Sequence, residues 1–137
     1  MRRFVEFILA TAFVVVATSA SAQKQRVQFA TTYNETLELD HYAAQGVAGK
    51  RPCVIFVFGG GFATGTKDAQ KYRAYFDMLT AAGYDVVSID YRLGLKATQS
   101  PDYNPAAVGL RETIATMKRS VNYAVEDLFR ATCYIID

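Results

Sequence analysis

Three consecutive glycines, Gly59, Gly60 and Gly61, are the residues of this sequence best suited to approach an anion. They directly follow the apolar run 53–58, which is typical of a buried strand. Because glycine has no Cβ, successive backbone N–H groups there can point at a negatively charged group. The pattern predicts an anion-binding turn after a strand. A plain tight turn between a strand and a helix is the simpler alternative.

The sequence around the glycines argues against two nucleotide-binding loops. A P-loop needs Gly-x4-Gly-Lys-Ser/Thr, but Gly65 is followed by Thr66-Lys67-Asp68, so the lysine comes one position late and the magnesium-binding hydroxyl is missing. A dinucleotide-binding fingerprint that starts at Gly59 needs Gly or Ala where Thr64 stands. We therefore do not expect the anion to be a nucleotide phosphate.

Other polar residues are interpreted as structural. His41, the one histidine, precedes the glycines and lies in a predicted hairpin, so we expect it to be a surface or hydrogen-bonded residue. Asp90 and Arg92 come at the end of a second predicted strand, where we expect a structural ion pair, with a catalytic pair as the alternative. Asp127 lies in a predicted helix, where it is expected to accept an orienting hydrogen bond.

Cys53 and Cys133 are the only two cysteines, and each lies in an apolar stretch. Cysteine is among the residue types most often fully buried, so we expect two buried thiols. A disulfide between them remains the alternative if the protein is exported to an oxidising compartment.

The segments 26–29 and 36–42 flank Asn34-Glu35 and predict a β-hairpin. Within the second segment Leu37 and Leu39 alternate with glutamate and aspartate. This alternation predicts that one face of the hairpin is in contact with water.

The next part of the chain predicts a βαβ unit. The run 53–58 reads as a strand buried on both faces, as in a parallel sheet. Apolar spacing over 68–82 predicts an amphipathic helix, with Asp68 as its N-cap and Gly83 just beyond its end. A second strand follows at 85–90, so the two strands should be parallel with a right-handed crossover. The fold class is therefore α/β.

Residues 96–105 are rich in Thr, Ser, Asn and Pro and predict a loop. The segment 110–136 predicts one long helix, or two in series, with no stop signal before Asp137. Its apolar row has no following strand to cover it and consists of Leu110, Ile114, Met117, Val121, Val125, Leu128 and Ile135.

The first 22 residues predict a signal peptide. Arg2 and Arg3 precede an apolar run over 7–17, and Ala20-Ser21-Ala22 fits a signal peptidase site. The run is shorter than the roughly 20 residues that span a bilayer. We therefore expect Sec-dependent export to the periplasm or the medium, with no membrane attachment after cleavage. The sequon Asn34-Glu35-Thr36 would matter only in a eukaryotic secretory route.

The charge is close to balanced. Removing Arg2, Arg3 and Glu6 from the 15 basic and 13 acidic residues leaves 13 and 12. This balance gives no electrostatic basis for binding nucleic acid or an anionic membrane.

Two motifs resemble a known family. The run Phe58-Gly59-Gly60-Gly61-Phe62 is similar to the His-Gly-Gly-Gly motif of α/β-hydrolase esterases and lipases. Asp90-Tyr91-Arg92-Leu93 resembles a signature of carboxylesterase and hormone-sensitive-lipase-like members, and the segment 124–134 resembles the helix before their nucleophile strand. The resemblance covers about residues 27–137. It implies the N-terminal half of that fold: an antiparallel hairpin plus parallel strands with crossover helices.

The resemblance implies that the N–H groups of Gly60 and Gly61 form an oxyanion hole, supported by Phe58, Gly59 and Phe62. Phe58 departs from the family, because a histidine stands there and braces the loop by hydrogen bonds. The implied substrate is a small carboxylic ester, cleaved by a serine acyl-enzyme route that needs no metal or organic cofactor.

The residues of the catalytic triad are not found. The family places a serine on a Gly-x-Ser-x-Gly elbow, followed by an acid and a histidine, and no such elbow occurs in the sequence. We expect a signal peptide at 1–22 and a partial domain at 23–137, truncated before the elbow and inactive alone. The alternative is a small secreted non-catalytic binding protein that docks a partner on its uncovered helix face. A weaker alternative is a dimer of two such chains that exchange elements.

Overall fold

The computed structural model describes residues 24–31 and 36–136. Some predicted features lie outside the described residues. These are the signal peptide 1–22, the pair Asn34-Glu35, which is also the start of the sequon, and Asp137. The strands are β1 (Lys24–Ala30), β2 (Thr36–Tyr42), β3 (Cys53–Val57) and β4 (Asp85–Ile89). The helices are α1 (Arg73–Ala81), α2 (Pro105–Val108) and α3 (Leu110–Ile136), with two 3₁₀ turns, η1 (Gln70–Tyr72) and η2 (Lys96–Gln99).

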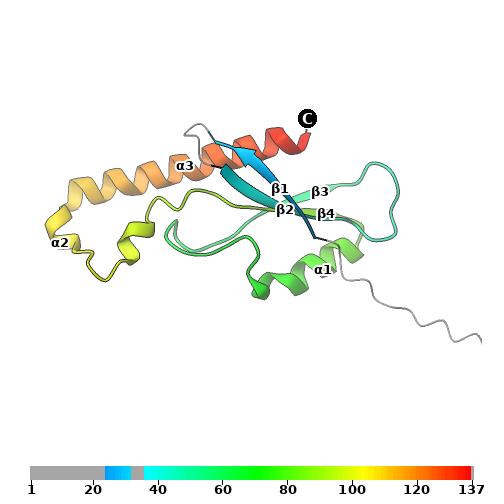
Figure 1. Ribbon diagram of the computed structural model, residues 1–137, viewed down its shortest axis with the longest axis horizontal. Helices are drawn as coiled ribbons and strands as arrows, with labels where there is room; N and C mark the ends of the chain where they lie inside the picture. Colours follow the sequence, from blue (N-terminus) through cyan, green and yellow to red (C-terminus); the bar gives the residue numbers. More distant parts are fainter. Residues whose placement is uncertain (1–23, 32–35, 137) are drawn as a thin grey trace, which may run out of the picture.

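The four strands form one mixed sheet in the order β1-β2-β4-β3 (Figure 1). β1 and β2 pair antiparallel, with Val27 opposite Leu39, which confirms the predicted hairpin. β3 and β4 pair parallel, as the βαβ prediction requires. β2 pairs antiparallel with β4 and joins the two units into a single sheet.

Two apolar clusters cover opposite faces of the sheet, because neighbouring residues of a strand point to opposite sides. Val87 and Ile89 of β4 pack with Leu39 and with Ala131 of α3. Val86 lies on the other face with Tyr42 and with Phe76 of α1. The sheet is thus a layer between α1 and the second half of α3.

Two expectations about the strands are wrong. Asp40 was assigned to a wet face of the hairpin, but it is fully buried, because three cationic side chains lie over its carboxylate. The strand at 53–58 was expected to be buried on both faces, yet β3 is only partly buried. It is an edge strand, with β4 as its one partner among the described residues.

α1 begins later than the sequence predicts. Residues 70–72 form a 3₁₀ turn, α1 starts at Arg73, and its N-cap is Tyr72, so the prediction of Asp68 as N-cap is wrong. The end is as expected. Gly83 has φ +91° and donates to the carbonyl of Thr80, and Tyr84 donates to that of Leu79, which is the Schellman pattern that stops a helix.

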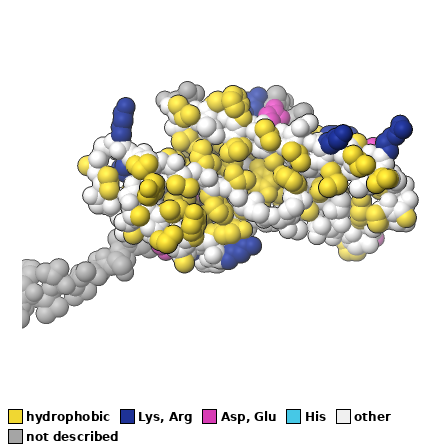
Figure 2. Space-filling model, turned by 180° about the vertical axis from the view of Figure 1, so that it is seen from behind, with side chains coloured by type: hydrophobic (Ala, Val, Ile, Leu, Met, Phe, Trp, Pro, Cys, Tyr) yellow, Lys and Arg dark blue, Asp and Glu magenta, His cyan; other side chains and the backbone are white. Residues whose placement is uncertain are grey.

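α3 is one continuous helix of 27 residues, which resolves the choice between one helix and two. Its buried residues are Ser120, Asp127 and Ala131. Much of the predicted apolar row is in contact with solvent: Leu110 is 77% exposed and Val125 is 62% exposed. Figure 2, which views the molecule from behind, shows hydrophobic side chains spread over much of that face. In the described part of the chain, no helix is both long and apolar enough to cross a membrane.

The prediction of two buried thiols is wrong. Cys53 and Cys133 are both exposed and neither is in a disulfide. Cys53 is the first residue of the edge strand β3, and Cys133 lies on α3 outside the face that covers the sheet. An apolar neighbourhood in sequence therefore does not bury either thiol.

Candidate active site

The glycine loop, residues 58–67, connects β3 to the segment before α1. Gly60 adopts φ +153° and Gly61 φ +62°. The N–H groups of Ala63 and Thr64 both donate to the carbonyl of Gly60 at 3.2 Å, which closes a tight turn. A Cβ on Gly60 would lie 1.8 Å from the carbonyl oxygen of Thr64, so only glycine fits there. The loop is thus a turn whose geometry depends on glycine.

The backbone N–H groups of Gly60 and Gly61 are available to a ligand. Both residues are exposed, and within the described residues neither N–H group donates a hydrogen bond. A glycine loop that leaves two neighbouring N–H groups unused can bind an oxyanion. The arrangement is chemically suited to the predicted role.

Phe58 braces the loop in a different way from the histidine it replaces. Its ring is buried and stacks on the ring of Tyr91, with 4.6 Å between the ring centres. The Tyr91 hydroxyl donates to the carbonyl of Phe58 at 2.9 Å. The sequence pattern identifies Tyr91 only as part of a motif. The signal for its role is its position just after β4, beside the end of the parallel strand β3.

Phe62 and Gly59 complete the loop. Phe62 has φ +60°, which is uncommon for a residue with a side chain, and its ring meets Tyr91 edge-on at 6.3 Å. Its carbonyl accepts a hydrogen bond from the Leu95 N–H at 2.9 Å. Gly59 is exposed, and a Cβ there would meet nothing within 4 Å.

Asp90 and Arg92 do not form the predicted ion pair with each other. Arg92 donates from its backbone N–H and its guanidinium to Asp127, at distances between 2.7 and 3.0 Å, and also reaches Glu126. Hydrogen bonding to Asp127 raises the pKa of Arg92, and burial opposes this. Asp127 is fully buried and accepts these bonds, as expected. Both residues are structural, but they fasten α3 to the end of β4.

Asp90 instead contacts Lys67 at the far end of the glycine loop. Lys67 Nζ lies 3.3 Å from Asp90, 3.4 Å from Glu38 and 3.9 Å from Asp40. Lys67 is only 4% exposed. Burial raises the pKa of Asp90, and the ammonium group of Lys67 partly offsets this rise.

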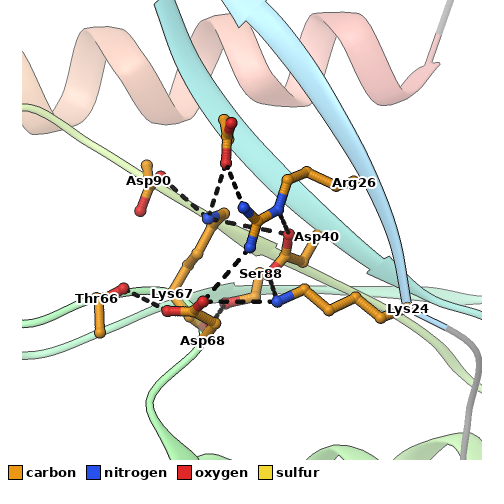
Figure 3. A network of polar contacts seen from close by, with 9 residues as sticks. Lys24, Arg26, Asp40, Thr66, Lys67, Asp68, Ser88 and Asp90 are labelled. Atoms are coloured by element: carbon orange, nitrogen blue, oxygen red, sulfur yellow. Dashed lines mark hydrogen bonds and ion pairs between the residues drawn. The ribbon is translucent and has the colours of Figure 1, made fainter.

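A network of charges surrounds Lys67 (Figure 3). Lys24 lies 2.7 Å from Asp40, and Arg26 contacts both Asp40 and Asp68. Asp68 also accepts from the Thr66 hydroxyl at 2.6 Å, which together with the nearby lysines lowers its pKa. The network joins the hairpin to the end of the glycine loop, and sequence analysis did not identify it.

His41 lies away from the glycine loop. It pairs in register with Val87, and its Nε2 lies 3.2 Å from Asp85 Oδ2. Asp85 begins β4, whereas the glycine loop follows the end of the parallel strand β3, so the two sites lie at opposite ends of these strands. This contact agrees with the expectation that His41 is a surface or hydrogen-bonded residue.

A cavity of about 360 Å³ lies between the 94–108 segment and the start of α3. The predicted loop over 96–105 contains the short η2, and α2 begins at its last residue. One hydrogen bond links the cavity to the glycine loop. The N–H of Leu95, which lines the cavity, donates to the carbonyl of Phe62. The hydroxyl groups of Thr98 and Thr113 donate to the carbonyls of Leu95 and Gly109. The cavity therefore offers a ligand mainly apolar surface.

Comparison with known proteins agrees with this arrangement. Residues 39–108, just over half of the chain, match the sequence model of the BD-FAE family. No curated protein matches the sequence.

Solved structures of esterases share the fold. Brefeldin A esterase, described as a bacterial homologue of human hormone-sensitive lipase, is 21% identical over 92% of this chain, with a TM-score of 0.60. The esterase Est22 and a bacterial heroin esterase are 17% and 19% identical over 85% of this chain, with TM-scores of 0.59 and 0.56. This chain covers about 30% of each of these structures. The predicted fold class, α/β with part of an α/β-hydrolase fold, is confirmed.

Proposed function

Because this chain belongs to the α/β-hydrolase-like BD-FAE family, we propose that it forms the part of a carboxylic ester hydrolase that supplies the oxyanion hole. The observation that supports this role is the exposed pair of N–H groups at Gly60 and Gly61, which donate no hydrogen bond within the described residues. The solved esterases of the same fold support the class of reaction.

In the proposed reaction, a serine attacks the ester carbonyl and the carbonyl oxygen becomes negatively charged. The N–H groups of Gly60 and Gly61 donate to this oxygen in the tetrahedral intermediate. Loss of one such donor typically costs about 3 kcal/mol of transition-state stabilisation. Phe58 and Phe62 support the donors by fixing the backbone on either side, whereas Gly59 has open space around it.

The nucleophile, acid and base are proposed to lie in sequence beyond these 137 residues. The sequence has no Gly-x-Ser-x-Gly elbow, and His41 lies at the opposite end of the strands from the glycine loop. The chain alone is therefore expected not to form an acyl-enzyme. Its short coverage of the solved esterases, about 30%, supports this view.

The substrate is proposed to be a small carboxylic ester. The cavity at 94–117 borders the glycine loop through the Leu95 to Phe62 hydrogen bond and offers mainly apolar surface to one side of the ester. The proposed serine acyl-enzyme route is one that needs no organic cofactor or metal.

The proposal includes export by the Sec route, with cleavage after Ala22. Its support is the arrangement of basic, apolar and small residues over 1–22. N-terminal sequencing of the secreted protein should then begin at Gln23.

A non-catalytic binding protein is the second candidate. The exposed apolar row of α3 is the observation that favours it, since Leu110, Met117 and Val125 are all more than half exposed. This candidate requires that no nucleophile elbow follows in the gene.

The first test is to read about 60 codons past Asp137 and to assay the 137-residue chain on p-nitrophenyl acetate. We expect a strand and Gly-x-Ser-x-Gly within about 30 codons, and no saturable hydrolysis by the short chain. A confirmed stop without an elbow would favour the binding protein, and saturable hydrolysis by the short chain would contradict the proposal.

A matched pair of variants tests the oxyanion hole in the longer product. Gly60→Ala forces a Cβ against the Thr64 carbonyl and displaces the donors, so kcat should fall by about 100-fold. Gly59→Ala meets open space and should retain activity. Equal activity of the two variants would contradict the role of Gly60.

A further inference from the structure

The glycine loop is held from one side by a single stretch of chain, the end of β4 and the residues that follow it. Three hydrogen bonds connect the two segments. The Tyr91 hydroxyl donates to the Phe58 carbonyl at 2.9 Å, and the Leu95 N–H donates to the Phe62 carbonyl at 2.9 Å. The third bond runs from the Ser88 hydroxyl to the Lys67 carbonyl at 2.7 Å.

The three bonds are spaced along the loop at its first residue, its middle and its last residue. Ser88 is fully buried and Tyr91 is 6% exposed, so two of the donors are shielded from competing water. In addition, Asp90 contacts the Lys67 ammonium group at 3.3 Å. The last residue of the loop is therefore held through both its backbone and its side chain.

Tyr91 differs from the other contacts because it acts on the residue next to the glycines. Its hydroxyl fixes the Phe58 carbonyl, and its ring stacks on the Phe58 ring at 4.6 Å. The Phe58 ring in turn lies against Gly65: a Cβ on that glycine would be 2.5 Å from the ring. The Phe58 ring thus lies between Tyr91 and Gly65 at the base of the loop.

The direction in which the Gly60 and Gly61 N–H groups point depends on the peptide planes that precede them. The peptide that carries the Gly60 N–H also carries the Gly59 carbonyl, and neither group makes a hydrogen bond within the described residues. The peptide that carries the Gly61 N–H is held separately, because its carbonyl, that of Gly60, accepts from the Ala63 and Thr64 N–H groups. For the Gly60 N–H, the nearest anchored group before it is the carbonyl of Phe58, which is bonded by Tyr91.

We propose that Tyr91 is a positioning residue for the oxyanion hole: it holds the Phe58 carbonyl and ring so that the Gly60 N–H group keeps one orientation. This inference rests on the proposed function for its purpose, but the mechanical role can be measured without catalysis. Tyr91 acts through Phe58, to which both its hydroxyl and its ring are joined.

The test is to measure backbone order parameters by ¹⁵N NMR relaxation on the purified chain. In the wild type, Gly60 and Gly61 should have order parameters close to those of β4, about 0.85, as for a rigid backbone. Tyr91→Phe retains the ring and removes only the hydroxyl. We expect the order parameter of the Gly60 N–H to fall below about 0.6. Those of β3, of β4 and of Gly61, whose peptide is held by the bonds to the Gly60 carbonyl, should be unchanged.

Two further variants make the result specific. Tyr84→Phe removes a hydroxyl from a tyrosine that is 40% exposed, and it should leave the glycines unaltered. Ser88→Ala should loosen residues 66–68 and leave Gly60 rigid, because it releases the opposite end of the loop.

An unchanged Gly60 order parameter in Tyr91→Phe would overturn the proposal, as would an equal loss in Tyr84→Phe. These outcomes are independent of ester hydrolysis. If no triad is found downstream, the proposed function fails while the relaxation result still decides whether Tyr91 holds the loop.

Discussion

At the residue scale, Asp85 joins three segments at the start of β4. Its carboxylate accepts hydrogen bonds from the Ala44 N–H at 2.7 Å and from the Arg51 guanidinium at 2.9 and 3.1 Å. His41 lies 3.2 Å away. Burial acts to raise the pKa of Asp85, but the bonds from Arg51, Ala44 and His41 lower it overall. The ionised form therefore stabilises the folded chain.

Arg51→Met should destabilise the fold by about 1–3 kcal/mol at pH 7, since it leaves a partly buried carboxylate without its main partner. A lowered carboxyl pKa stabilises the fold above the ordinary value near 3.8, and this stabilisation disappears as pH falls through the folded-state pKa. The difference in free energy of unfolding between the variant and the wild type should therefore be smaller in acid. Urea unfolding at pH 7 and pH 3 measures this difference.

Arg119→Met provides the control for this prediction. Its ion pair with Glu112 is more than half exposed on both sides, so its loss should change stability little at either pH. A difference for Arg51→Met that stays constant with pH would contradict the role of Asp85 ionisation.

Residues whose roles depend on local sequence could be predicted, and those with distant partners could not. The glycine loop could be identified because three glycines after an apolar run suffice to define it. Tyr91 and Ser88 bond to atoms 33 and 21 residues away in sequence, and no spacing rule reveals such partners. The expected Asp90–Arg92 pair failed for the same reason, because Lys67 and Asp127 are the partners that folding brings near.

At the element scale, hydrophobic periodicity identified the helices and strands better than it identified their environment. The hairpin, the parallel pair and α3 all occur where predicted. β3 was expected to be buried because its run is continuous and apolar, but it lies at the edge of the sheet. An apolar run predicts a strand, while the number of its neighbours depends on the whole sheet.

The end of α1 offers a test at this scale. Gly83→Ala places a side chain at φ +91°, in the left-handed region, and should destabilise the fold by about 1–2 kcal/mol. Thermal unfolding followed by circular dichroism measures the change. Gly59→Ala is the control, because that glycine has open space around it and no positive φ, and a similar loss in both would contradict the argument.

At the scale of the whole molecule, α3 carries an apolar surface that the described residues leave uncovered. Ile114, Met117, Val121 and Val125 are each between 43% and 62% exposed. A contiguous apolar surface of this kind is typical of an interface or of a site of aggregation. The esterase and the binding-protein proposals both require that something covers it.

The double variant Val121→Glu/Val125→Lys should reduce self-association of the chain. The two new charges stand four residues apart on the helix, an arrangement that supports the helix itself. Sedimentation velocity should show association of the wild type that increases with concentration, and a monomer for the variant. Circular dichroism should show equal helix content. A wild type that remains monomeric at all concentrations would contradict the expectation.

The strand order has a consequence for the time at which the protein can fold during synthesis. β1 and β2 emerge first, yet β2 must pair with β4, whose residues follow more than 40 positions later. Until α1 and β4 have been synthesised, Leu39 of the hairpin lacks its packing partners on β4. Asp40 likewise lacks its contact with Lys67 until the glycine loop can pack against the hairpin. The βαβ unit can form from contacts nearer in sequence, so the hairpin should be the last part of the sheet to dock.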